Sequence, residues 1–278
     1  MNKSYWNADS VISRIRDIAG KKRFAAGSPD AFETLIYSRF LPSDCQLVVV
    51  LGMTPELRNM AAGFCRRLIS IDHNEVSIST YKDWLSPAFS SRERIVQGDW
   101  NDLEKILPES ADFVLGDGIF GNIVPLSNYS GLLKLIRSVL THRGCFVTRQ
   151  CLMPDWVLEK PDQRHTLLEK YRNRTLNEAA FGLSMRLHGY SDIAYDPDTA
   201  LLDNKKVFSA VDEDLQSGFL LMSEYRIIRR YFFDGMNSLP TQRAWETILK
   251  ATGFAFTRPV YTGEYWYAYY PVYCCHLN

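Results

Sequence analysis

Three aspartates and one glycine stand where apolar runs of the sequence end. Gly52 closes the run Gln46–Leu51, and Asp72, Asp99 and Asp117 close three later runs. Apolar, β-branched runs of this kind predict strands that are buried on both faces of a parallel sheet. Ligands of such sheets bind outside the carboxyl ends of the strands, so the four residues would converge on one rim. We interpret that rim as a binding site.

The spacing of Asp72 indicates which part of a ligand it would hold. It follows Gly52 by 20 residues. A carboxylate at this distance is placed to accept hydrogen bonds from both hydroxyls of a ribose, because the second strand runs beside the first. The alternative is a helix cap for the following segment, since Asp is a preferred N-cap residue.

The other two aspartates have neighbours that suggest further roles. Asp99 or an adjacent backbone N–H can read an adenine edge, and the ring of Trp100 can pack on the adenine face. Core packing is the alternative for Trp100. Asp117 would face the rest of a nucleotide or a substrate, and Gly116 and Gly118 allow close approach of the backbone.

The residues after Gly52 do not form a phosphate cradle. The sequence contains neither GxxxxGK[ST] nor GxGxxG, and Met53, Thr54, Pro55 and Glu56 follow Gly52 directly. A pyrophosphate needs glycines and a free helix N-terminus, whereas the proline removes one N–H and the glutamate adds negative charge. This disfavours dinucleotides and favours a nucleoside with a positive or zwitterionic tail.

The elements that must position these residues alternate between strand and helix. Strands are expected at 46–52, 68–72, 94–99, 111–118 and 144–149, and helices at 8–19, 30–40, 55–65, 74–84, 103–107 and 129–140. This order predicts an α/β fold with a doubly wound, mostly parallel sheet. Residues 155–235 read as mostly helical, with a loop at 191–204 and a helix at 211–232. A helix at 241–252 and a hairpin of strands 254–261 and 267–274, connected by 262–264, close the chain.

Composition excludes several classes of protein. The 278 residues include 32 Lys and Arg against 32 Asp and Glu, so general nucleic-acid binding is not expected. The six cysteines form no CxxC pair, and we predict neither a metal site nor a disulfide framework. The sequence shows no secretory signal and no membrane span, which predicts a cytoplasmic protein.

Together these motifs resemble the class I S-adenosylmethionine-dependent methyltransferases. The resemblance rests on Val48–Gly52, Ile71–Asp72, Gly98–Trp100, Ala111–Gly118 and Gly144–Arg149, and it covers about 46–150 and 241–276. It implies a seven-stranded Rossmann-like sheet in a single methyltransferase domain spanning 1–278. Within that domain it implies an N-terminal helical lid (1–40), a cofactor-binding core (46–150), a helical substrate cap (151–240) and a final helix and hairpin (241–278).

The resemblance also implies an activity, which is methyl transfer from S-adenosyl-L-methionine to a small molecule. In-line displacement of this kind is promoted mainly by positioning. The expected cofactor contacts are Gly52, Met53, Thr54, Asp72, His73, Asp99, Trp100, Asp117 and Gly118. The expected substrate contacts are Tyr5, Trp6, Phe120, Arg149 and Tyr231. No catalytic base is assigned, because His73, His165, His188 and Tyr231 have no supporting spacing.

Departures from the family pattern leave two alternatives open. Val50 stands where the family has an acid, and Thr54 and Glu56 replace later glycines. One alternative is a non-catalytic relative that binds a ligand or a partner protein. The other is an NAD(P)-dependent oxidoreductase, which only the spacing between Gly52 and Asp72 supports.

Overall fold

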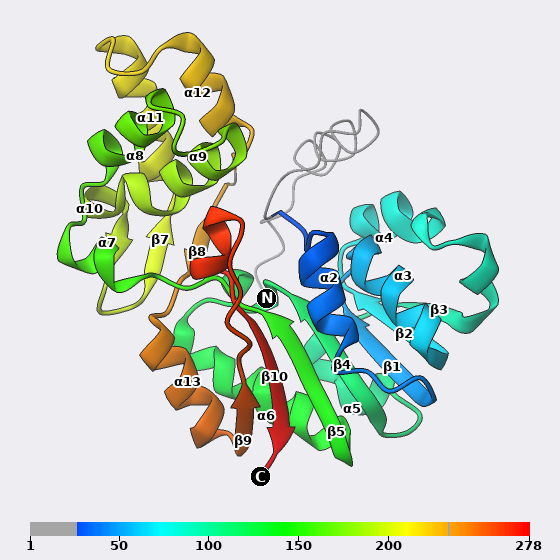
Figure 1. The fold of residues 1–278 in the computed structure, drawn as a ribbon. Coiled ribbons are helices and arrows are strands. Elements are labelled where there is room, and N and C mark those ends of the chain that lie inside the picture. The colour runs from blue at the N-terminus through cyan, green and yellow to red at the C-terminus, as the bar shows by residue number, and fades with distance from the viewer. Residues whose placement is uncertain (1–26, 233) are drawn as a thin grey trace.

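A seven-stranded sheet forms the centre of the protein. The computed structural model describes residues 27–232 and 234–278. The strand order is β3-β2-β1-β4-β5-β10-β9 (Figure 1). The strands are β1 (Cys45–Leu51), β2 (Cys65–Asp72), β3 (Glu93–Gln97), β4 (Ala111–Asp117), β5 (Leu140–Arg149), β9 (Phe254–Thr257) and β10 (Val272–Leu277). All neighbours pair in parallel except β10, which is antiparallel to both β5 and β9. The predicted doubly wound, mostly parallel sheet is confirmed.

Helices cover both faces of this sheet because successive side chains of β1 point to opposite sides. Val48 and Val50 pack with the helices α2 (Ala31–Ser38) and α3 (Pro55–Phe64). Leu47 and Val49 belong to the core on the other face. That second layer contains α5 (Leu103–Ile106), α6 (Tyr129–Val139) and α13 (Gln242–Ala251).

Short helices occupy several of the connections between these elements. They are α4 (Glu75–Tyr81), η1 (Lys82–Trp84), η2 (Pro87–Arg92), η3 (Trp100–Asp102), η4 (Ile119–Asn122) and η5 (Leu126–Asn128). The start of α2 agrees with its sequence signal, because the Asp30 side chain accepts a hydrogen bond from the Glu33 N–H as a helix cap. The helix predicted at 241–252 is present as α13, which ends at Ala251, and Gly253 adopts a φ of 84° two residues later.

Residues 155–238 form a second group of elements with their own hydrophobic core (Figure 1). They comprise α7 (Asp155–Glu159), α8 (Arg164–Arg172), α9 (Glu178–Ser184), a π-helix (Met185–Gly189), α10 (Ser191–Ala194), α11 (Asn204–Gln216) and α12 (Met222–Arg229). A small antiparallel sheet adds β6 (Tyr195–Asp196), β7 (Leu201–Asp203) and β8 (Met236–Ser238). The role of this region as a substrate cap stays a prediction.

Several predicted element boundaries were wrong. The expected loop at 191–204 contains α10, β6 and β7, and the expected helix at 211–232 is two helices. Gly218, at a φ of 80°, lies between them. The strand expected from residue 144 begins at Leu140, because β5 continues through Gly144. A Cβ at that glycine would lie 3.0 Å from the Ala111 carbonyl oxygen, so only glycine fits there without a shift.

The hairpin connection also differs from the prediction. Residues 265–268, expected in part as strand, form the 3-10 helix η7 (Tyr265–Ala268), and β10 starts only at Val272. The Leu152 N–H donates to the Tyr269 carbonyl, and the Gln150 N–H donates to the Pro271 carbonyl. Both bonds keep the register of the β5–β10 pairing, in which Val272 lies opposite Arg149, so 269–271 continue beside the chain that follows β5. Pro271 has no N–H to donate in return, which makes this stretch irregular. None of the helices in the described part of the chain combines the length and the apolar character needed to cross a membrane.

Candidate cofactor-binding site

The four strand-end residues lie along one edge of the sheet, as predicted. Strands β3, β2, β1 and β4 are neighbours in that order, so their carboxyl ends follow one another. The Gly52 N–H donates to the Ile71 carbonyl at 2.8 Å, and the Gly98 N–H donates to the Asp72 carbonyl at 3.0 Å. These bonds bring the ends of three strands to the same level.

The turn after β1 leaves open space. Gly52 has a φ of 99°, and a Cβ added there would meet no atom within 4 Å. Thr54 is the N-cap residue of α3, and Pro55 follows at the start of the helix. Met53 is buried against Tyr81. Within the described part of the chain, Gly52 is therefore half-buried with free space on the side where a Cβ would stand.

Gly52→Ala tests whether this conformation requires glycine. We expect the free energy of unfolding to fall by about 1 to 2 kcal/mol, because alanine is strained at a positive φ. Gly63→Ala is the matched control, since a Cβ there also meets nothing within 4 Å and the residue lies in α3. Alanine should be neutral or stabilising at this helical position. Equal losses in urea unfolding of the two variants would contradict the expectation.

Asp72 does not serve as the cap of the following helix. Asn74 has that role, because its side chain accepts hydrogen bonds from the N–H groups of Val76 and Ser77. Asp72 Oδ1 accepts a hydrogen bond from the Asn74 N–H at 2.9 Å, and the backbone N–H of His73 also interacts with the carboxylate. His73, largely exposed, has Nδ1 3.8 Å from Asp72 Oδ1. The cap alternative is therefore wrong, and the carboxylate retains accepting capacity.

The environment of Asp72 opposes its charged form. Its side chain is 13% exposed, and burial raises the pKa of this carboxyl above its usual 3.8. The folded chain thus holds the proton more readily than the unfolded chain does. Consequently, this group lowers the free energy of unfolding as the pH rises from 3.8 through the raised pKa.

Asp72→Asn should remove this penalty. We expect the variant to be more stable than the wild type at neutral pH, by up to about 1 kcal/mol, and equally stable at a pH below both pKa values. The amide oxygen can still accept from the Asn74 N–H, so the local turn survives. Urea unfolding at the two pH values measures the difference, and a less stable variant at neutral pH would disprove this explanation.

At the end of β3, the Asp99 side chain forms its hydrogen bonds within its own turn. Asp99 accepts hydrogen bonds from the backbone N–H and the side-chain amide of Asn101, each at 2.9 Å. The Trp100 indole donates to the Ile71 carbonyl at 2.9 Å, and its ring is 8% exposed among core residues. Trp100 therefore packs in the core, which was the alternative reading. A contact between this pair and an adenine stays a prediction.

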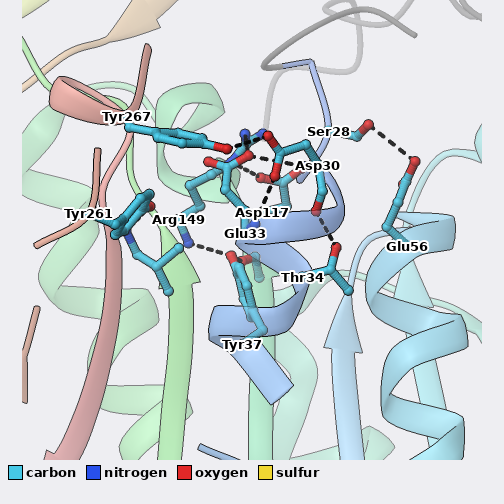
Figure 2. A network of polar contacts seen from close by, with 12 residues as sticks. Ser28, Asp30, Glu33, Thr34, Tyr37, Glu56, Asp117, Arg149, Tyr261 and Tyr267 are labelled. Atoms are coloured by element: carbon cyan, nitrogen blue, oxygen red, sulfur yellow. Dashed lines mark hydrogen bonds and ion pairs between the residues drawn. The ribbon is translucent and has the colours of Figure 1, made fainter. Parts of the chain in front are cut away.

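The ends of β4 and β5 form a buried network of charges (Figure 2). Arg149 Nε donates to Asp117 Oδ1 at 2.8 Å, and Nη1 donates to Glu33 Oε2 at 2.9 Å. The guanidinium also lies 4.6 Å from the ring centroid of Tyr270. The side chains of Arg149 and Glu33 are 1% and 0% exposed. Arg149, expected to contact substrate, is therefore held between two carboxylates of the chain itself.

Helix α2 supplies two site residues that the sequence did not reveal. The Tyr37 hydroxyl donates to the Gly116 carbonyl at 2.8 Å and accepts from the Arg149 N–H at 2.6 Å. Glu33 lies one turn earlier on the same face of α2. The only sequence signal is the spacing of Asp30 and Glu33, which marks a capping box and not a site.

Of the remaining substrate candidates, the two that the structure describes make contacts within the protein itself. Phe120 is fully buried against Tyr129 and Trp245, and the Tyr231 hydroxyl donates to the Ala179 carbonyl within the helical region. Tyr5 and Trp6 lie outside the described residues, as do the helix expected at 8–19 and most of the predicted lid. Substrate contacts by these residues stay predictions.

The histidines named as possible bases also lie elsewhere, apart from His73. The ring of His188 packs between those of Trp156 and Tyr269, and burial lowers its pKa to about 3. His165 packs on Phe219 at the surface of the helical region. The structure thus adds no support for either as a base.

Comparison with known proteins supports the fold. No family model and no curated protein matches the chain. Among solved structures, the chain is similar to a protein of Rhodobacter sphaeroides provisionally described as a Zn-dependent alcohol dehydrogenase, with a TM-score of 0.58 and 15% identity over 98% of this chain and 97% of that one. It is similar to the DhpI–SAH complex, with a TM-score of 0.53 and 10% identity over 98% and 96%.

A third similar structure is an S-adenosylmethionine-dependent methyltransferase of Clostridium acetobutylicum ATCC 824. Its TM-score is 0.52 at 12% identity, with 98% of this chain and 100% of that chain covered. At these identities the likeness concerns the fold alone. The chain has the Rossmann-like fold of the class I methyltransferases, which confirms the resemblance at the level of architecture.

Proposed function

We propose that the chain is an S-adenosyl-L-methionine-dependent methyltransferase that acts on a small molecule. The observation that carries this proposal is Asp72, a largely buried carboxylate at the end of β2 that caps no helix and keeps accepting capacity beside the open turn at Gly52. The shared fold with the DhpI–SAH complex supports it.

The residues at this edge fit such a cofactor. Asp72 would accept the ribose hydroxyls, and Gly52 and Thr54 would let the nucleoside tail approach the backbone. When bound, the cofactor supplies a methyl group on a sulfonium sulfur. Asp117 and Gly118 would face the place where acceptor and methyl group meet, and residues 151–240 would cover the acceptor. The chain would act mainly by holding the reactants in line.

Two rival functions differ from this proposal, one in the cofactor that binds and the other in the absence of methyl transfer. The first is a nicotinamide-dependent oxidoreductase, which the Rhodobacter sphaeroides structure suggests by its description. Pro55 and Glu56, however, occupy the place where a dinucleotide needs free N–H groups. The second rival is a non-catalytic relative, which would bind the same cofactor and transfer nothing.

Calorimetric titration with S-adenosylmethionine, S-adenosylhomocysteine and NADH in parallel separates these possibilities. We expect the first two compounds to bind and NADH not to bind. Binding of NADH alone would overturn the proposal in favour of the oxidoreductase. Incubation with radiolabelled S-adenosylmethionine and a panel of small acceptors should then show label transfer, whereas cofactor binding without transfer to any acceptor would favour the non-catalytic relative.

A further inference from the structure

Glu33 is a buried acid with one unsatisfied oxygen. Its Oε2 accepts hydrogen bonds from Arg149 Nη1 at 2.9 Å and from the Asp30 N–H at 3.1 Å. Its Oε1 is also buried, and no atom of the described residues donates to it. A buried carboxylate oxygen without a donor is costly, so such atoms in native proteins usually have a partner.

The charges around Glu33 indicate what kind of donor is missing. Two carboxylates, those of Glu33 and Asp117, both pair with the guanidinium of Arg149. The three side chains together therefore carry an excess of negative charge when ionised. Burial and the charge of Asp117 raise the pKa of Glu33, while Arg149 lowers it. A positively charged donor would supply the missing hydrogen bond at Oε1 and would also offset the excess negative charge.

The position of Glu33 points toward the proposed cofactor site. The Tyr37 hydroxyl links α2 to the ends of β4 and β5 through two hydrogen bonds. Glu33 lies on the same face of α2, one turn nearer the carboxyl edge of the sheet. Ser28, just before α2, donates to Glu56 in the first turn of α3 at 3.2 Å (Figure 2). Glu33 itself lies at the carboxyl ends of β4 and β5, where Arg149 pairs with both Glu33 and Asp117.

We propose that Glu33 binds the ammonium group of the cofactor's methionine tail through Oε1. This inference rests on the proposed function. An ammonium group offers three N–H donors, and one of them would complete the hydrogen bonding of Glu33. Arg149 is the positioning residue in this arrangement, because it holds Oε2 and thereby fixes the direction of Oε1.

Two ligands that differ only in the tail test the proposal. S-adenosylhomocysteine carries the amino-acid tail, whereas 5′-methylthioadenosine lacks it. We expect Glu33→Gln to weaken binding of S-adenosylhomocysteine by about tenfold or more, as measured by calorimetry, and to leave binding of 5′-methylthioadenosine unchanged. The neutral amide keeps the shape of the side chain and loses the charge that attracts the ammonium.

Glu224→Gln is the matched control. Glu224 is also buried, also accepts a hydrogen bond from the backbone N–H of the residue that precedes its helix, and also pairs with an arginine, Arg172. It lies in α12, away from the sheet edge. We expect it to affect stability in the same direction as Glu33→Gln, and to leave the affinity for S-adenosylhomocysteine unchanged.

Several results would overturn the inference. Unchanged affinity of Glu33→Gln for S-adenosylhomocysteine would do so, as would an equal loss for both ligands. If Glu33→Gln does not fold, the affinities of the wild type for S-adenosylhomocysteine and for its analogue without the amino group are compared instead. Equal affinities would exclude an ammonium contact. A wild type that binds neither S-adenosylhomocysteine nor 5′-methylthioadenosine would overturn the proposed function itself.

Discussion

Arg149→Met is expected to lower the free energy of unfolding by about 3 to 5 kcal/mol. The substitution leaves Glu33 and Asp117 in place without their shared guanidinium, although both side chains are almost fully buried. Domains of this kind are stable by only about 5 to 15 kcal/mol, so the variant would lose a large part of its stability. Urea unfolding followed by circular dichroism measures the loss.

The pH dependence of this loss identifies its cause. In the variant, both carboxyls should have pKa values well above their usual range, because no positive charge offsets their burial. Protonation then relieves the penalty, so the variant should regain stability as the pH falls through these raised values. A loss that is the same at every pH would show that packing, not charge, accounts for it.

Arg67→Met provides the comparison. Arg67 forms an ion pair with Glu109, but the two side chains are 54% and 45% exposed. Exposed pairs of this type contribute little to stability because water screens them. We therefore expect no measurable change for this variant.

The second large effect concerns the ligand. Asp72→Ala is expected to weaken binding of S-adenosylmethionine and S-adenosylhomocysteine by more than about tenfold and to leave the fold intact. The substitution removes an acceptor for the ribose hydroxyls, while Asn74 continues to cap α4 (Glu75–Tyr81). Calorimetry measures the affinities, and circular dichroism checks the fold.

Asp112→Ala is the control for this experiment. Asp112 lies at the opposite end of the sheet, where its Oδ2 accepts from the Gln46 N–H at 2.7 Å. Its loss should lower stability and leave ligand affinity as it is in the wild type. If Asp72→Ala binds as tightly as the wild type, the ribose assignment is wrong.

Local patterns were sufficient to predict the strands and their ends. An apolar run such as Val48–Leu51 is buried on both faces wherever it folds, so its composition alone identifies a central strand. Positions where such runs stop then fall at one sheet edge, which is why Gly52, Asp72 and Asp117 were found without a structure. Strands β1 to β4 end within two residues of the predicted ends.

Other features depended on partners far away in the chain. Residues 267–271 have the composition of a strand, yet 265–268 form the 3-10 helix η7, in which Trp266 and Tyr267 are buried in the core of the helical region. Whether Asp72 caps a helix or faces a ligand was equally open in the sequence. The structure excludes the cap, because Asn74 provides it, and the contact of Asp72 with a ligand stays a prediction.

The sequence by itself determined the α/β fold class, the succession of strands and helices along the central part of the chain, and the sheet edge at which Gly52, Asp72 and Asp117 lie, because these follow from the hydrophobic pattern of neighbouring residues. Only the tertiary structure showed that Arg149 is enclosed by Glu33 and Asp117. Glu33 and Arg149 are 116 residues apart, and the sequence of a helix face does not indicate which strand end the helix will contact. Their contact arises from the packing of α2 against the sheet, whereas contact of Arg149 with a substrate stays a prediction.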